Sequence, residues 1–506
     1  MQRTRRYGYA LGTLSAAMLA STAMAQTTGP SSSQTPYVTP TAPGVDVTSI
    51  LTVGDAADNG YQMVGVPDGL GAFDNGNGTF TVLMNHELGN TQGIVRAHGS
   101  AGAFVSQWVI NKSDFSVISG QDMIQSANDV FTWNSNTSAW VAGTTAWNRL
   151  CSADLADVGA FYNASSGKGY AGRIFMNGEE NGPPFGDPGR AFGWIATGSE
   201  AGKAYELPYL GKFAWENSLA NPFTGDKTVV IGTDDTTPGE VYLYVGDKQT
   251  TGNAVEMAGL HGGQLYGIKV AGVPTETSAI NGTFSLEAVT GNTTGAALQT
   301  ESTTDGVTQF ARPEDGHWLD ADTFFFVTTG ISGQSAKLYR LDFSDANDLT
   351  LGGSITMIQD SAALLGTDGQ AARSFDNLVV TADGTILIQE DPGNTSYDAK
   401  TWLYNPATDD WTQILESDRD RFITGGISFL TQDEENSGII EITDILARND
   451  GLRYFLGDTQ AHYNIAGELV QGGQLYVVSV PEPASMALLA LGGLALSFRG
   501  RRRGVR

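Results

Sequence analysis

The fold class is decided by the turn Asp74-Asn75-Gly76-Asn77-Gly78 and the run that follows it, Thr79-Phe80-Thr81-Val82-Leu83-Met84. Asn-Gly dipeptides favour tight hairpin turns, and β-branched and aromatic residues favour strands. The same order recurs at Asn281-Gly282, before an apolar run at 283–286, and at Asp383-Gly384, before one at 385–388. Amphipathic helical patterns are scarce. The chain is therefore predicted to be all-β.

The length of the chain favours a modular arrangement of these strands. No linker or change of composition interrupts residues 45–479, a stretch of roughly 435 residues that is long for a single core. A β-propeller accommodates such a length, because every added blade brings its own packing surface. We expect a β-propeller of about six blades with a few short helices. A large sandwich or two separate β-domains are the alternatives.

The N-terminal residues read as an export signal and a linker. Arg3, Arg5 and Arg6 precede an apolar stretch at 9–20, and Ala23-Met24-Ala25 supplies small residues for cleavage. This order is typical of a secretory signal peptide, here residues 1–25. Residues 26–44 are rich in Thr, Ser, Pro and Gly without periodicity. They are predicted to form a flexible linker.

The C-terminal segment 480–506 has the pattern of a second targeting signal. Val480-Pro481-Glu482-Pro483 precedes an apolar run at 484–498 and then an arginine cluster at 499–503. The segment resembles the PEP-CTERM sorting signal of Gram-negative bacteria, which implies an exosortase as partner. An apolar run of this length is marginal for a membrane span, and the arginines following it favour the cytoplasmic side. We expect transient anchoring in the inner membrane, with the mature protein in the periplasm, at the cell surface or in the extracellular matrix.

Composition excludes several classes of function. The chain has 55 acidic and 28 basic side chains and a formal net charge of -27, so nucleic acid is a poor partner. A single cysteine, Cys151, excludes intramolecular disulfides and cysteine-rich zinc or iron-sulfur sites. An acidic exported protein of this kind either stays soluble through its charge or gathers divalent cations.

Acidic residues follow four apolar runs where the predicted strands end. The residues are Glu87, Glu179 with Glu180, Asp234 with Asp235, and Glu390 with Asp391. Equivalent strand ends of a propeller can lie on one face around its channel, so these carboxylates are expected to converge. Converging carboxylates repel one another unless protons or cations lie between them, and hard oxygen ligands suit Ca²⁺. The sequence therefore predicts at least one calcium ion.

Three further positions are candidates for chemistry. Arg312 lies beside Glu314, and an arginine next to metal-binding carboxylates can hold phosphate oxygens bidentately; a structural ion pair is its alternative. Arg373 precedes Asp376, whose oxygens could bind a metal or cap a turn. His86, between Asn85 and Glu87, is the candidate catalytic histidine, against a hydrogen-bonded core role. No metalloprotease, nucleophile-elbow or P-loop motif occurs in the sequence.

Several of these phrases together resemble the PhoX-type alkaline phosphatases and their relatives. They span most of residues 60–395 in the family's order: Pro67-Asp68-Gly69-Leu70, Asn85-His86-Glu87, Asn177-Gly178-Glu179-Glu180, Arg312-Pro313-Glu314, Asp376-Asn377-Leu378 and Asp383-Gly384. The resemblance implies a six-bladed propeller with iron and calcium in its central channel, which hydrolyses phosphate esters outside the cytoplasm.

The resemblance also implies roles for individual residues. Glu179 or Glu180, Glu314, Asp376 and Glu256 correspond to metal ligands, and Arg312 to a phosphate contact. One position departs from the pattern, because Gly178 stands where the resemblance implies an iron-binding cysteine. The one cysteine, Cys151, lies 28 positions before Glu179; it either reaches the site through the fold or is a small buried hydrophobic residue. Calcium without iron is the simpler expectation.

Two functions follow from this sequence. The first is a calcium-binding phosphoesterase, with or without iron, that acts on extracellular phosphate esters, with Arg312 and His86 as catalytic groups and Arg312 and Arg373 binding substrate. Its metal ligands would be drawn from Glu87, Glu179, Glu180, Glu256, Glu314 and Asp376. The second is a non-catalytic, calcium-stabilised propeller at the cell surface or in the exopolysaccharide matrix, motivated by Gly178 and by the sorting tail.

Overall fold

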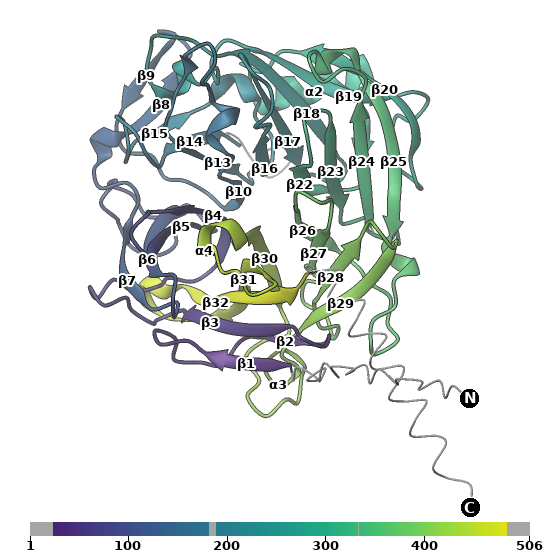
Figure 1. Ribbon diagram of the computed structural model, residues 1–506. Coiled ribbons are helices and arrows are strands. Elements are labelled where there is room, and N and C mark those ends of the chain that lie inside the picture. The colour runs from purple at the N-terminus through teal and green to yellow at the C-terminus, as the bar shows by residue number, and fades with distance from the viewer. Residues whose placement is uncertain (1–23, 182–188, 332, 483–506) are drawn as a thin grey trace, which may run out of the picture.

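Five β-sheets, of which a ten-stranded one spans two blades, surround a central channel in the computed structural model, which describes residues 24–181, 189–331 and 333–482 (Figure 1). The innermost strands are β4 (Pro67–Asp74), β10 (Leu150–Asp154), β16 (Trp215–Ala220), β22 (Pro313–Trp318), β26 (Phe375–Val380) and β30 (Glu434–Glu441). Each inner strand packs against the next one, and β30 packs against β4, so the ring closes. The predicted β-propeller is confirmed, and its described part has six blades.

Blades 1 and 3 contain strands that are consecutive in sequence, whereas in blade 2 the two outermost strands precede the inner one in the chain. Blade 1 continues with β5 (Thr79–His86), β6 (Phe104–Asn111) and β7 (Val117–Asp122). Blade 2 continues with β13 (Ile174–Glu179), β14 (Ala191–Ile195), β15 (Ala204–Glu206), β8 (Val130–Asn134) and β9 (Ala139–Ala142). Blade 3 continues with β17 (Lys227–Asp234), β18 (Gly239–Asp247) and β19 (Gln264–Val270).

The remaining blades complete the ring. Blade 4 adds β23 (Thr323–Thr328), β24 (Lys337–Phe343) and β25 (Gly353–Asp360), and β20 (Asn281–Val289) pairs with both β25 and β19 of blade 3. Blade 5 adds β27 (Ile386–Glu390), β28 (Lys400–Asn405), β29 (Asp410–Ser417) and β2 (Val38–Pro40). Blade 6 adds β31 (Leu452–Asn464), β32 (Gln471–Pro481), β3 (Asp46–Thr52) and β1 (Ala25–Thr28).

Short elements decorate the blades. They are the strand pair β11 (Tyr162–Asn163) and β12 (Lys168–Gly169), strand β21 (Gln309–Phe310), and helices α1 (Ala254–Met257), α2 (Gly295–Asp305), α3 (Arg419–Phe422) and α4 (Thr443–Leu446). None of the helices in the described ranges is long and apolar enough to cross a membrane. The apolar run at 484–498, predicted as a membrane segment, lies outside the described residues.

The N-terminal segment is not the flexible linker that its composition suggested. Strand β1 pairs with β3, and β2 pairs with β29 of blade 5. Tyr37 is 2% exposed and Val38 is fully buried, in an apolar cluster with Val47 and Leu415. Burial of these side chains outweighs the low periodicity of the segment. The last strand also extends to Pro481, two residues past the expected domain boundary.

Each inner strand is irregular at the same place. Pairing with the second strand of the blade shifts register after the first residue of β10, β16, β22 and β26 and after the second residue of β4 and β30. Such β-bulges leave residues out of the ladder and redirect their side chains. At one end of the channel the propeller therefore presents six side chains from equivalent positions.

Candidate metal centre

The second residue of every inner strand is a potential metal ligand. These residues are Asp68, Cys151, Glu216, Glu314, Asp376 and Glu435. The first five are at most 8% exposed, and none carries an apolar side chain that would fill the channel. The bulges therefore direct five carboxylates and one thiol toward a common axis.

The side chains form three overlapping groups whose ligand atoms all lie within 4.8 Å of one another. The groups are Asp68 with Glu87 and Cys151, Cys151 with Glu180 and Glu216, and Glu216 with Glu314 and Asp376. Because Cys151 and Glu216 each belong to two groups, the seven residues form one continuous cluster. Glu87 and Glu180 come from the ends of second strands, where the sequence predicted converging carboxylates.

The electrostatics of this cluster favour bound cations. Burial, followed by repulsion from neighbouring carboxylates, raises the pKa values of Asp68, Glu216, Glu314 and Asp376 well above their usual range. Burial together with the same negative neighbours also raises the pKa of the Cys151 thiol. A cation placed among the ligands would reverse these penalties and hold the groups ionised.

The donor types fit two kinds of metal ion. Glu216, Glu314 and Asp376 offer only oxygen atoms, the ligands that Ca²⁺ prefers. The groups on either side of Cys151 combine one thiol with carboxylates, and a thiolate selects a softer transition metal. The residues present therefore fit a hard cation such as calcium at one end of the cluster and a softer transition metal around Cys151.

Two arginines lie over this cluster from equivalent positions. Arg149 and Arg312 directly precede the inner strands β10 and β22, and both have left-handed backbones, with φ of 50° and 61°. Arg149 binds Glu87 at 2.8 Å and also contacts Glu180. Arg312 binds Asp235 through two nitrogens at 2.7 and 2.9 Å and lies 3.2 Å from Glu314.

The exposure of the two guanidinium groups sets them apart from the ligands. The Arg149 and Arg312 side chains remain 45% and 32% exposed, whereas the Glu314 side chain is 2% exposed. They therefore face solvent on one side and the carboxylates on the other. This is the arrangement in which an anion arriving from solvent meets two guanidinium groups before it reaches the cluster.

Only some of the predicted ligands lie in the cluster. Glu87, Glu180, Glu314 and Asp376 belong to the cluster. Glu179 instead forms a bidentate ion pair with Arg190, at 2.7 and 2.8 Å, and belongs to none of the three groups. Alternation along β13 accounts for this, because adjacent residues of a strand point in opposite directions.

Glu256, the other predicted ligand, lies at helix α1 and not in the channel. Its carboxylate accepts a hydrogen bond from the backbone N–H of Asn253 at 2.9 Å, while the Asn253 side chain accepts one from the Glu256 N–H. This reciprocal pair is a capping box that starts the helix. The residue has a local structural role, which differs from the ligand expected from the resemblance.

Two predicted functional residues also lie apart from the cluster. His86 is 1% exposed, and its ring nitrogens lie 3.1 Å from the Gly65 carbonyl oxygen and 2.9 Å from the Ser106 hydroxyl. Its ring also stacks on Phe104, so the geometry matches the core alternative and not catalysis. Arg373 is exposed, with its guanidinium 3.9 Å from the centre of the Tyr397 ring.

Three residues of the site were not predicted from the sequence: Asp68 and Glu216 as ligands and Arg149 as a cluster contact. For Cys151 the sequence left two roles open. A signal was present, because the second positions of the inner strands form a degenerate repeat, an acid or Cys followed by a small or polar residue: Asp68-Gly69, Cys151-Ser152, Glu216-Asn217, Glu314-Asp315, Asp376-Asn377 and Glu435-Asn436.

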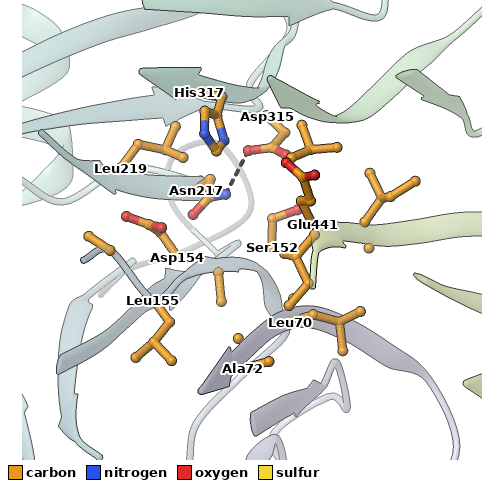
Figure 2. Close-up of a pocket in the computed structure, with 18 of the residues that line it drawn as sticks. Leu70, Ala72, Ser152, Asp154, Leu155, Asn217, Leu219, Asp315, His317 and Glu441 are labelled. Carbon is orange, nitrogen blue, oxygen red and sulfur yellow. Dashed lines mark hydrogen bonds between the residues drawn. The ribbon is translucent and has the colours of Figure 1, made fainter. Parts of the chain in front are cut away.

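The opposite end of the channel holds a cavity of about 510 Å³ (Figure 2). Asp154, His317 and Glu441 line it, and Figure 2 shows Asn217 bonded to Asp315 at 2.6 Å along its wall. Bulge residues such as Ser152 and Asn377 line this cavity, whereas their neighbours Cys151 and Asp376 belong to the ligand cluster. The channel therefore has two chemically different ends.

Comparisons with known proteins agree with this architecture. Residues 479–503 match the PEP-CTERM protein-sorting motif, and no curated protein sequence matches the chain. PhoX of Pseudomonas fluorescens, in complex with vanadate, a transition state analogue, is similar in structure. The TM-score is 0.61 at 14% sequence identity, covering 89% of this chain and 97% of that chain. The chain has a PhoX-like fold.

Other structural similarities are weaker. A putative 6-phosphogluconolactonase from Bacteroides uniformis has a TM-score of 0.31 at 10% identity, over 78% of this chain and 98% of that chain. Trypanosoma rangeli sialidase in complex with the inhibitor DANA has a TM-score of 0.33 at 10% identity, over 92% of this chain and 64% of that one. These scores carry no functional argument.

The PhoX-like propeller is thus combined with a sorting signal. The PEP-CTERM motif indicates recognition by an exosortase at the C-terminus. It also indicates export toward the surface or extracellular matrix of a Gram-negative bacterium. At 14% identity the likeness to PhoX establishes the fold, and the chemistry of the site has to be argued from the residues themselves.

Proposed function

We propose that this protein is an exported, metal-dependent phosphoesterase that hydrolyses extracellular phosphate esters at the end of its channel. The observation that carries the proposal is the cluster of seven ligand residues with Arg149 and Arg312 beside it. The similarity to a PhoX structure holding vanadate supports the same reaction class.

The carboxylates and Cys151 would bind the metal ions, and the arginines would bind the phosphate. Glu216, Glu314 and Asp376 would hold calcium, while Cys151 with its neighbouring carboxylates would hold iron. Such ions, when bound, polarise a phosphoryl group and offset its charge. The guanidinium groups of Arg149 and Arg312 bind and orient the phosphate oxygens bidentately.

Existing ion pairs with acidic partners hold the two arginines ready for an anion. Arg312 is held by Asp235 through two hydrogen bonds, so its guanidinium plane is fixed before a ligand arrives. Because the guanidinium plane is already fixed, substrate binding loses less conformational entropy. Like-charged carboxylates alone would repel a phosphate, so the arginines and bound cations together must produce a local positive field.

The non-catalytic alternative loses one of the two observations that motivated it. Besides the sorting tail, it rested on Gly178 in place of a thiol beside Glu179, but Cys151 lies in two of the three ligand groups. The cluster therefore does have its thiol, delivered by an inner strand. We accordingly favour the phosphoesterase over a purely structural propeller.

The test is hydrolysis of p-nitrophenyl phosphate by the exported protein, purified without chelator with calcium and iron supplied. We expect activity that falls at least about 100-fold in Glu314→Gln, because that change removes one anionic ligand. Glu287→Gln is the matched control, since Glu287 pairs with Lys269 on the surface and should leave the rate unchanged. Equal rates for wild type and Glu314→Gln would refute the proposal.

A further inference from the structure

A chain of three hydrogen bonds runs through buried side chains to the backbone of Cys151. The indole Nε1 of Trp194 donates to Asn177 Oδ1 at 2.7 Å, and Asn177 Nδ2 donates to Asn85 Oδ1 at 2.8 Å. Asn85 Nδ2 then donates to the carbonyl oxygen of Cys151 at 2.5 Å. Trp194, Asn177 and Asn85 are fully buried.

The direction of this chain is fixed by its first member. An indole nitrogen can only donate, so the atom of Asn177 that faces it must be the oxygen. The amide nitrogen of Asn177 consequently faces Asn85, and the amide nitrogen of Asn85 faces the Cys151 carbonyl. The orientation of both asparagines follows from donor chemistry and leaves no ambiguity between their oxygen and nitrogen atoms.

The carbonyl at the end of the chain lies in the β-bulge. In strand β10, Leu150 pairs with Glu179 and Ala153 with Asn177, so Cys151 and Ser152 lie between ladder pairs. A buried carbonyl without a ladder partner needs another donor. Asn85, on strand β5 of blade 1, supplies it across the boundary between two blades.

Gly69 leaves the room that this contact requires. A Cβ atom at Gly69 would lie 2.6 Å from Asn85 Nδ2 and 2.5 Å from the backbone nitrogen of Ala153. Any side chain at this position would displace either the asparagine or the bulge. Residues of β4, β5 and β10 therefore fit together at one point next to the thiol.

We propose that Asn85 and Asn177 are positioning residues that orient Cys151 as a metal ligand. Fixing the Cys151 carbonyl fixes the peptide plane at the bulge, and with it the direction of the Cα–Cβ bond. The Cys151 Sγ atom then lies 3.6 Å from Asp68 Oδ2, within the ligand cluster. The inference deepens the proposed function, on which its metal-binding part rests.

The test replaces Asn85 by leucine, which has a similar shape but neither donates nor accepts a hydrogen bond. Cobalt(II) alone serves as the probe, because thiolate ligation gives a charge-transfer absorption that carboxylate ligation lacks. We expect Asn85→Leu to weaken cobalt binding about 10- to 100-fold, the usual effect of removing a partner behind a metal ligand, and to reduce the thiolate band.

The matched control is Asn221→Leu. Asn221 is also fully buried and also donates from Nδ2 to a backbone carbonyl, that of Ala321 at 3.1 Å, but away from the cluster. Asn221→Leu makes the same chemical change as Asn85→Leu, and we expect it to lower the free energy of unfolding by a similar amount. We expect the thiolate–cobalt band of Asn221→Leu to match that of the wild type.

A second readout needs no metal. Cys151 is 8% exposed in the structure. In chelator-treated protein we expect iodoacetamide to alkylate it several-fold faster in Asn85→Leu than in wild type or Asn221→Leu. If the wild type shows no thiolate–cobalt band but the alkylation rates differ in this way, the metal proposal fails and the positioning role survives.

Unchanged cobalt binding together with unchanged alkylation in Asn85→Leu would overturn the inference. If Asn85→Leu does not fold, Trp194→Phe replaces it, because phenylalanine keeps the aromatic packing but removes the first donor of the chain. We expect the same two changes in that variant at smaller size. A wild-type response of Trp194→Phe in both assays would then refute the positioning role.

Discussion

At the scale of single residues, the two arginines beside the cluster and the exposed Arg373 differ in what they contact. Arg149 and Arg312 touch cluster carboxylates, whereas the Arg373 guanidinium stacks on Tyr397. A phosphate bound at the cluster would therefore meet the first two. The contacts of each arginine, more than its place in a sequence motif, indicate its role.

We predict that Arg312→Ala lowers kcat/KM for a phosphate monoester about 100-fold, comparable to the loss of one oxyanion donor. Arg373→Ala should change it less than about threefold, because its guanidinium contacts no cluster residue. Steady-state kinetics on both variants at saturating metal provide the measurement. A larger loss for Arg373→Ala than for Arg312→Ala would contradict the site described above.

His86 leads to a prediction about pH and stability. Burial, with the nearby Arg96 charge adding to it, lowers the pKa of His86 to about 3. Because the folded pKa is below the unfolded value of about 6.5, the neutral ring stabilises the fold above pH 6.5. That contribution is lost as pH falls through 6.5 toward 3, by about 2 kcal/mol between pH 7 and pH 5.

The measurement compares wild type with His86→Gln, so that other titrating groups cancel in the difference. The wild type should lose more free energy of unfolding than the variant between pH 7 and pH 5. A catalytic role for His86, in contrast, predicts loss of activity at neutral pH with little change in the pH dependence of stability. Parallel stability curves for the two proteins would disprove the core assignment.

At the scale of elements, local signals predicted the turns at 74–78 and 383–384 but not the one expected at Asn281-Gly282, because both residues are paired with β25 inside β20. The turn at 74–78 connects β4 and β5 as expected, since Asn and Gly adopt the turn conformation whatever surrounds them. The partners of β1 and β2 could not be predicted, because β2 pairs with β29, far along the chain. Composition alone therefore misassigned residues 26–44.

Tyr37→Ala tests whether this N-terminal segment is part of the fold. Tyr37 packs edge-on against Phe422, and its backbone N–H donates to the Gln474 side chain at 2.6 Å. We predict a loss of about 3–5 kcal/mol in the free energy of unfolding, typical of removing a buried aromatic ring. Gln34→Ala, at an exposed site, is the control. A flexible linker predicts no loss for either variant.

In the site, too, some ligands could be predicted from local sequence and others only from the folded ring. Glu87 and Glu180 could be predicted because each directly follows an apolar run and so marks the end of a strand. Glu314 was predicted from the neighbouring Arg312 and Asp376 from its place ahead of a strand, and the resemblance to PhoX supported both. Cys151 could not be placed, since its neighbours Asp68 and Glu216 are distant in sequence and meet only when the ring closes. Glu256 shows the converse, an acid of suitable spacing whose partner is its own helix.

At the scale of the whole molecule, the propeller concentrates negative charge along one axis. Six inner strands bring their second residues together, and the pKa values of most of the cluster carboxylates are raised as a result. Bound cations would therefore link separate blades, in addition to their proposed role in phosphate hydrolysis. Ring closure by β3 pairing with β32 provides the complementary link between the two ends of the chain.

The most direct test of the account is the metal content of the exported protein, purified without chelator after expression with calcium and iron supplied, in wild type and Cys151→Ser. We predict calcium and iron in the wild type, and calcium with little iron in Cys151→Ser, because a hydroxyl is a poor substitute for thiolate. Wild-type protein that is folded but holds neither metal would contradict the central claim that the channel is a metal centre.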